Sequence, residues 1–150
     1  MNWVSPVDGS DLKKISDVAF SDGTHEFSYK RELLDLRFPQ VAVGDEAKVL
    51  EFYDNRAADY ERYIHLTFYT YGLDEITERN RMLDRLHAKP GQKVLEVACG
   101  TGKDSALLAD RLGPSGTLCI TDISENMLTL AMRKSVKWEP LVELALASSS

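Results

Sequence analysis

Two glycines and a distant carboxylate are the residues of this sequence best suited to hold a nucleotide. Gly100 and Gly102 follow the short apolar run 93–97, and a helical pattern begins directly after them. Glycine has no Cβ, so a ligand can lie against its backbone, and the free N–H groups that begin a helix favour an anionic group. Asp122 ends a second apolar run, 117–121, about 20 residues further on, where a carboxylate can bind both hydroxyls of a ribose. The spacing therefore predicts a strand, a glycine loop, a helix and a second strand that together bind a nucleotide.

Two cofactor classes share this arrangement, nicotinamide dinucleotides and S-adenosylmethionine. A dinucleotide loop has a third glycine or an alanine, and the third position here is Ser105. Glu96 lies in the first apolar run, where a negative charge disfavours a pyrophosphate but can hold the ammonium group of a methionine moiety, directly or through water. Both residues favour S-adenosylmethionine. An NAD-dependent oxidoreductase is the third of our alternatives for function.

The elements that must position these residues indicate an α/β protein. Helices are predicted over residues 103–112 and 125–135, the second with Ser124 as its N-cap. A further helix is predicted over residues 74–87, with its charge run on a solvated face. The tail 141–147 is predicted as one short strand or a helical turn. We expect a parallel sheet with flanking helices.

Several motifs, in order, resemble the class I S-adenosylmethionine-dependent methyltransferases, and within them the ubiquinone/menaquinone biosynthesis type. The resemblance covers residue 52 to about residue 134 and lies in the segments 52–60, 71–73, 89–102 and 121–128. It implies that the chain is the N-terminal part of a Rossmann-like methyltransferase fold, preceded by a small hairpin-like segment. One departure is Ala98, where many members have glycine and members of the quinone type often have alanine.

The resemblance also implies a role for individual residues in binding S-adenosylmethionine. Asp122 would bind the ribose hydroxyls, with Ile123 and Met127 against the adenine. The residues implied at the methionine end are Glu96, Ala98, Gly100, Thr101 and Gly102, and Tyr60 from the motif 52–60 is counted with the cofactor-binding residues. By its helical spacing alone, Met127 is more often a core residue than a ligand contact, and Ile123 is a plausible core residue too. No catalytic base is predicted.

The segment 51–71 is aromatic and charged, and it admits two interpretations. The resemblance implies that it folds over the cofactor and helps to build a pocket for a small-molecule acceptor, which suits a flat apolar acceptor such as a quinone ring. The alternative is a helix that begins within residues 41–50 and packs its aromatic side chains on the sheet.

Composition limits the classes of partner. The chain has 150 residues, 43% hydrophobic content and a net charge of -6, with a pI near 5.1, which argues against nucleic acid or an anionic membrane as the main partner. No apolar run approaches the roughly 18 residues of a membrane span, and no signal peptide is seen, so we expect a cytoplasmic protein. Cys99 and Cys119 are predicted to be buried free thiols. The three histidines lack metal-ligand spacing, so no metal is assigned.

The sequence pattern of residues 1–40, which begins with a turn-rich stretch, differs from that of residues 41–150. We expect residues 1–40 to form a separate small unit. Strand-like pieces at 15–20 and 24–29 predict a hairpin. The segment is also similar to a zinc-ribbon-like unit that precedes some methyltransferase domains. Ser5 and Asp8 stand where that unit has thiolates, so no structural zinc is expected.

A methyltransferase sheet of the resembled type has seven strands, and this chain has room for about three. One edge of the strand at 94–98 should be unpaired unless the N-terminal region or another chain covers it. We therefore expect a truncated or alternative product of a longer gene, or completion of the sheet by self-association, and we favour truncation. The function predicted is methyl transfer to a small-molecule acceptor, with impaired cofactor binding and low turnover at this length. The alternative is a non-catalytic partner or regulatory product that pairs with a full-length methyltransferase.

Overall fold

The centre of the molecule is a parallel sheet. The structure is a computed structural model that describes residues 3–39, 42 and 44–148. The strands of this sheet are β5 (Lys93–Val97), β6 (Thr117–Asp122) and β7 (Leu141–Leu146), and β6 lies between the other two. Six consecutive buried residues make β6 the most enclosed strand, as expected for the middle of a parallel sheet. The tail is thus a strand rather than a helical turn, and the α/β prediction is confirmed.

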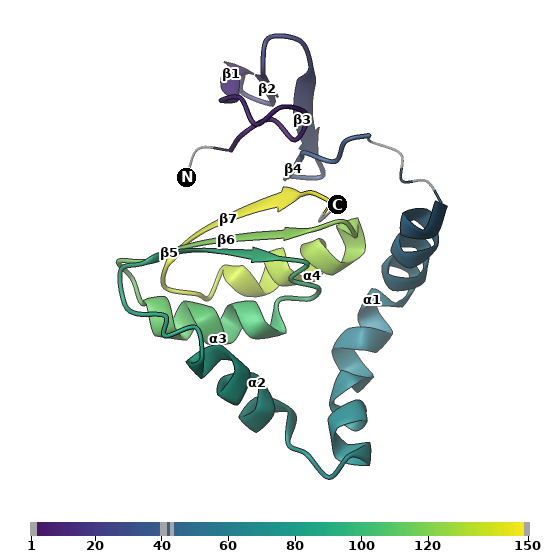
Figure 1. The fold of residues 1–150 in the computed structure, drawn as a ribbon, viewed down its shortest axis with the longest axis vertical. Helices are drawn as coiled ribbons and strands as arrows, with labels where there is room; N and C mark the ends of the chain where they lie inside the picture. The colour runs from purple at the N-terminus through teal and green to yellow at the C-terminus, as the bar shows by residue number, and fades with distance from the viewer. Residues whose placement is uncertain (1–2, 40–41, 43, 149–150) are drawn as a thin grey trace.

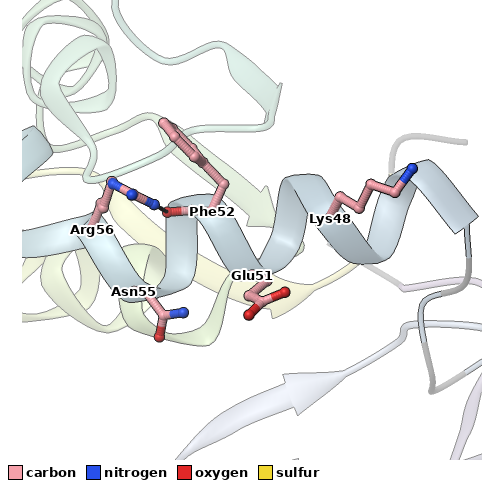
Figure 2. A pocket seen from close by; sticks show the side chains of 5 residues that line it. All are labelled: Lys48, Glu51, Phe52, Asn55 and Arg56. Carbon is pink, nitrogen blue, oxygen red and sulfur yellow. Dashed lines mark hydrogen bonds between the residues drawn. The ribbon is translucent and has the colours of Figure 1, made fainter.

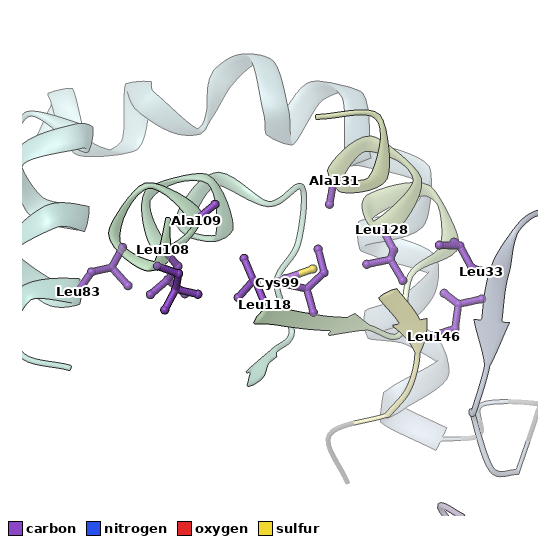
Figure 3. Packing of buried hydrophobic residues seen from close by; sticks show 11 residues of the cluster. Leu33, Leu83, Cys99, Leu108, Ala109, Leu118, Leu128, Ala131 and Leu146 are labelled. Atoms are coloured by element: carbon purple, nitrogen blue, oxygen red, sulfur yellow. The ribbon is translucent and has the colours of Figure 1, made fainter. Parts of the chain in front are cut away.

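Helices α3 (Lys103–Leu112) and α4 (Glu125–Ser135) cover one face of these strands (Figure 1), and both have the predicted bounds. The Ser124 hydroxyl accepts a hydrogen bond from the Met127 N–H at 3.1 Å, so the predicted N-cap of α4 is confirmed. Leu108 of α3 and Leu128 of α4 share one buried cluster with Leu118 of β6 (Figure 3). Ile120 of β6 belongs to the same cluster. Each fully buried leucine or isoleucine contributes roughly 1.5–3 kcal/mol, so this layer accounts for much of the stability.

Helix α1 (Gly44–Thr70) stands beside the sheet and packs on α4 (Figure 1). Val41, which the sequence places near the start of this helix, lies outside the described residues. Ala57 is the buried residue of α1, whereas Phe52, Tyr53 and Tyr63 are exposed, so these aromatic side chains do not pack on the sheet. Helix α2 (Glu75–Asp84) follows, with Asp74 as its N-cap and an end before the predicted residue 87.

The N-terminal residues form a four-stranded unit rather than the single predicted hairpin. Its antiparallel strands are β1 (Lys13–Ser16), β2 (Ala19–Ser21), β3 (Glu26–Lys30) and β4 (Leu33–Asp35). The predicted strand 15–20 is wrong because a turn at residues 17–18 divides it, with the Val18 N–H donating to the Ser16 hydroxyl at 3.3 Å.

Strand β4 joins this N-terminal unit to the main sheet, because it pairs in parallel with β7 and places Asp35 opposite Leu146. The strand order is β1-β2-β3-β4-β7-β6-β5, so the N-terminal unit extends the β7 side and leaves β5 at the other edge. The edge that we expected to be open is open in the described part of the chain. Leu95 and Val97 on β5 remain 53% and 49% exposed.

The carboxylate of Asp22, whose side chain is 2% exposed, joins Ser5 to the turn at residues 22–25. The Ser5 hydroxyl donates to Asp22 Oδ2 at 2.6 Å, and the N–H groups of Thr24 and His25 donate to Asp22 Oδ1 at 2.8 and 2.7 Å. These bonds, led by the one from Ser5, hold the pKa of Asp22 well below its usual range. Among the residues that the structure describes, no group of three His, Cys, Asp or Glu side chains could hold a metal ion. Both cysteines are free and buried, as predicted.

We expect Asp22→Asn to destabilise the N-terminal unit at neutral pH, because an amide cannot accept all the hydrogen bonds of the carboxylate. Since the folded pKa is lowered from 3.8, the stabilising effect is complete above that value and is lost as the pH falls towards the folded pKa. Urea unfolding should therefore show a larger difference from the wild type at about pH 7 than at about pH 3. Asp17→Asn is the control, because Asp17 is 99% exposed. A difference that is independent of pH would contradict this account.

Candidate functional site

The glycine loop and the end of β6 are joined by one carboxylate. Asp122 Oδ2 accepts the Gly100 N–H at 2.8 Å, and Asp122 Oδ1 accepts the Ser124 N–H at 2.8 Å. Asp122 is buried, and burial raises its pKa while the backbone N–H groups of Ser124 and Gly100 act in the opposite direction. The two segments predicted to form a nucleotide site are thus in direct contact at the carboxyl edge of the sheet. Each carboxylate oxygen still has a lone pair for a ligand.

The two glycines of the loop have different reasons to be glycine. Both have positive φ, 56° at Gly100 and 75° at Gly102. A Cβ on Gly102 would lie 3.0 Å from the Cβ of Ala131, so that glycine lets α3 and α4 approach closely. Among the atoms of the described residues, a Cβ on Gly100 would meet only Tyr60 Cε1, at 4.0 Å, so this part of the structure leaves the space over Gly100 open. Ala98 is exposed with a φ of 57°, a backbone conformation that costs an alanine about 1–2 kcal/mol.

Between the glycines, Thr101 carries an unpartnered polar atom. Its side chain is buried, and its hydroxyl lies close enough to Glu61 to lower the pKa of that carboxyl. Among residues 3–39, 42 and 44–148, however, it finds no hydrogen-bond partner of good geometry. No side chain caps the adjacent start of α3. A buried hydroxyl without a partner costs about 1–3 kcal/mol, so a ligand that bonds to it would recover free energy. The loop therefore fits a polar ligand.

Glu96 is the acid of β5 and faces α3. Its Oε2 accepts the Ser105 hydroxyl at 2.6 Å. Burial, together with the charges of Asp104 and Asp122, raises the pKa of Glu96 to about 7, against the lowering effect of Ser105. A half-buried carboxylate next to other acids is stabilised by a cation. The side chain is thus suited to bind an ammonium group.

An ion network that was not predicted supports the start of α3. Arg79 of α2 bonds Glu75 at 2.9 Å and Asp104 at 2.8 Å, and Lys103 lies 3.3 Å from Glu75. The Arg79 side chain is 11% exposed, which corrects the prediction that the charge run of this helix is solvated throughout. The i,i+4 spacing of Glu75 and Arg79 was a sequence signal for one of these pairs. The pair with Asp104 could not be predicted, because Asp104 belongs to another helix.

The loop after β6 and the start of α4 hold two more of the predicted residues, Ile123 and Met127. Ile123 is half-buried, and its carbonyl oxygen accepts a bond from Arg37 Nη1 at 3.3 Å. Met127 is 2% exposed, which is compatible with a core role, and its contact with adenine remains a prediction. Asp54 of α1 accepts the Ser124 hydroxyl at 2.7 Å and the Asn126 N–H at 3.0 Å. Asp54 was not predicted, because its partners lie about 70 residues away in the sequence.

Aromatic side chains of α1 lie beside the glycine loop. Tyr60 reaches Gly100, and its ring lies 6.3 Å from that of Tyr53. A hollow of about 260 Å³ is lined by this aromatic face of α1, including Phe52, Tyr53, Tyr60 and Tyr63. A flat apolar molecule is the ligand that such a surface favours.

A second hollow, of about 610 Å³, is likewise lined by residues of α1 alone: Lys48, Glu51, Phe52, Asn55 and Arg56. Figure 2 shows Phe52 and Arg56 on one side of the helix and Glu51 and Asn55 on the other. Neither hollow is enclosed, because each is a surface of one helix. The aromatic hollow includes Tyr60, which approaches Gly100, whereas the second hollow does not include Tyr60. We therefore do not include this hollow in the site.

Covalent chemistry by the nearest thiol is disfavoured. Burial, with the charges of Asp122 and Glu96, raises the pKa of Cys99, so its sulfur stays protonated and a poor nucleophile. The arrangement is thus one that binds and orients a ligand.

Comparison with known proteins shows which protein family this chain resembles. The ubiE/COQ5 methyltransferase family matches residues 41–148. Among curated relatives, the ubiquinone/menaquinone biosynthesis C-methyltransferase UbiE of Bordetella avium is 37% identical over 92 residues, which are 61% of this chain and 35% of the relative. The demethylmenaquinone methyltransferase of Lysinibacillus sphaericus is 39% identical over 66 residues, 44% of this chain and 28% of the relative.

The comparison with solved structures agrees with this family match. A solved structure described as a DhpI-SAM-HEP complex aligns with a TM-score of 0.51 and 26% identity, over 72% of this chain and 45% of that one. The chain spans about a third of the length of the curated relatives that it matches. With its glycine loop, its β6 carboxylate and the family match over most of its length, the chain belongs to the ubiE/COQ5 methyltransferase family.

Proposed function

We propose that this chain binds S-adenosylmethionine at the glycine loop and takes part in methyl transfer to a small-molecule acceptor. The observation that carries the proposal is the bond from the Gly100 N–H to Asp122, with the unpartnered hydroxyl of Thr101 beside it. The family match favours S-adenosylmethionine over a nicotinamide dinucleotide.

Each end of the cofactor has a group of this chain suited to it. Asp122 would accept bonds from the ribose hydroxyls, with Ile123 beside the adenine. Glu96 would pair with the ammonium of the methionine moiety. Ala98, Gly100, Thr101 and Gly102 would form the backbone wall of this end, and Met127 would lie behind the adenine. The bound cofactor would supply a sulfonium methyl group for transfer to a nucleophile.

The contribution of the protein would be to hold the two reactants in line and to exclude water. We propose the aromatic hollow on α1, with Tyr60 at its border with the loop, as part of the acceptor surface. A quinone-like ring fits such a surface, and the Bordetella avium relative is a ubiquinone/menaquinone biosynthesis enzyme. Buried free thiols support a reducing compartment, and we propose the cytoplasm. Among the described residues, no helix is both long and apolar enough to span a membrane.

Calorimetry with S-adenosylhomocysteine tests the cofactor proposal. We expect Asp122→Asn to weaken binding by roughly tenfold to a hundredfold, because a hydrogen bond to a charged group contributes about 1.5–3 kcal/mol. Since this variant also loses a backbone contact, Thr101→Val is the second variant: it should weaken binding while raising the melting temperature, because it removes a buried unpartnered hydroxyl. Absence of heat with the wild type, or unchanged affinity in both variants, would sink the proposal.

A pH series tests the role of Glu96. Because the pKa of Glu96 is raised to about 7, the free site is protonated below that pH and binds an ammonium group poorly. The affinity for S-adenosylhomocysteine should therefore rise between about pH 5.5 and pH 7.5. The same series with Glu96→Gln, or with 5′-methylthioadenosine, which lacks the amino-acid end, should be flat. A wild-type affinity that does not change over this range would exclude the Glu96 pairing.

The open edge of β5 favours a second candidate function, a non-catalytic partner that pairs with a second copy or with a full-length methyltransferase chain. Alternate residues of this strand, Leu95 and Val97, are about half exposed, and β5 contains neither proline nor a bulge that would protect an edge.

Light scattering over a concentration series tests pairing between copies. We expect a rise in mass with concentration, and Leu95→Asp should return the chain to a monomer because it places a charge in the contact. Leu86→Asp, at an exposed residue after α2, is the matched control and should leave the mass unchanged. A monomer at all concentrations would refute self-association, and the absence of a complex with a full-length relative on size exclusion would refute the partner role.

A further inference from the structure

We propose that the N-terminal unit is a positioning device for the cofactor, and that Arg37 is its positioning residue for the adenosyl half. This inference rests on the proposed cofactor function. It concerns residues outside the family match, which begins at residue 41.

Arg37 links the N-terminal unit directly to the loop after β6. Its Nε and Nη2 donate to the two carboxylate oxygens of Asp35 at 2.9 and 2.6 Å, while Nη1 donates to the Ile123 carbonyl at 3.3 Å. The side chains of Arg37 and Asp35 are 11% and 10% exposed. A guanidinium held in a bidentate pair has a fixed orientation, so Arg37 fixes the residue that follows Asp122.

Two more cations of the N-terminal unit form ion pairs with the residue that begins α4. Lys30 and Arg31 pair with Glu125, the first residue of α4, at 2.8 and 2.9 Å. Arg31 and Glu32 form the two-residue turn between β3 and β4, and both have positive φ, 47° and 71°. On the other side, Asp54 of α1 holds Ser124 and Asn126. The segment 123–126, which ends in the first residues of α4, is therefore held from two sides by segments distant in sequence.

The topology brings the N-terminal unit to the ligand edge. Because β4 runs parallel to β7, its carboxyl end, Asp35, lies at the same edge of the sheet as Leu146 and Asp122. Ligands of open α/β sheets bind outside the carboxyl ends of the strands. Arg37 lies two residues after Asp35 and thus lies beside the predicted adenosyl site. A loop held in place before the ligand arrives loses less entropy on binding.

The test compares Arg37→Gln and Arg37→Lys with the wild type in the full chain. Lysine keeps the charge but cannot bond both Asp35 oxygens and Ile123 together. We expect Arg37→Gln to weaken S-adenosylhomocysteine binding by about tenfold, with partial rescue by lysine. Lys14→Gln is the matched control: it removes a cation of the same unit whose partner is the exposed Asp17, and it should leave the affinity unchanged.

A second ligand separates positioning from general loss of structure. 5′-Methylthioadenosine has the adenosyl group without the amino-acid end, so Arg37→Gln should weaken both ligands by the same factor, whereas Glu96→Gln should weaken S-adenosylhomocysteine alone. Unchanged affinity in Arg37→Gln, or a loss restricted to S-adenosylhomocysteine, would overturn the inference. So would a lowered affinity that lysine does not rescue, since this would indicate general loss of structure. A wild type that binds neither ligand would instead refute the proposed cofactor function.

Discussion

The carboxylate of Asp122 is the contact on which the site depends. It accepts one N–H from the glycine loop and one from the loop after β6, so two turns at the ends of neighbouring strands share a single acceptor. Such a contact requires β5 and β6 to be parallel neighbours, which the register of Val97 opposite Thr121 provides. It also requires positive φ at Gly100 and a closely packed α4 against Gly102. Loop geometry, helix packing and sheet register thus all determine the position of the Asp122 carboxylate. The affinity of a ligand that bonds to this carboxylate should depend on all three.

The sheet around this contact is asymmetric. Helices α3 and α4 cover one face of β5, β6 and β7, and the N-terminal unit continues the sheet beyond β7 (Figure 1). The opposite edge, at β5, carries exposed Leu95 and Val97. The interior is therefore well packed near the loop after β6, where the adenosyl group is proposed, and open near β5. In our proposal the N-terminal unit would act on the adenosyl side, while the methionine side would depend on Glu96, Arg79 and the start of α3.

Local signals predicted the parts of the fold that local chemistry decides. Gly102 and Ser124 begin α3 and α4 where the sequence indicated, because a left-handed glycine and a hydroxyl cap act within a few residues of the chain. The pairing of β4 with β7 could not be predicted, since Leu34 and Ala145 are distant in the sequence and neither type of residue specifies a partner. For the same reason Arg37, Asp54 and Arg79 were missed: each is an ordinary charged residue whose role comes from a partner on another element. Val18 was misassigned to a strand because its β-branched side chain favours one, although a serine bond closes a turn there.

The central claim is that the carboxyl edge between β5 and β6 holds the adenosyl compound, and an amide NMR titration with S-adenosylhomocysteine tests it most directly. The account predicts saturable shifts at Gly100, Thr101, Gly102 and Ile123, with smaller changes along α4. Shifts confined to the surface of α1 around Lys48 and Arg56, or no shifts in the glycine loop at ligand saturation, would contradict it.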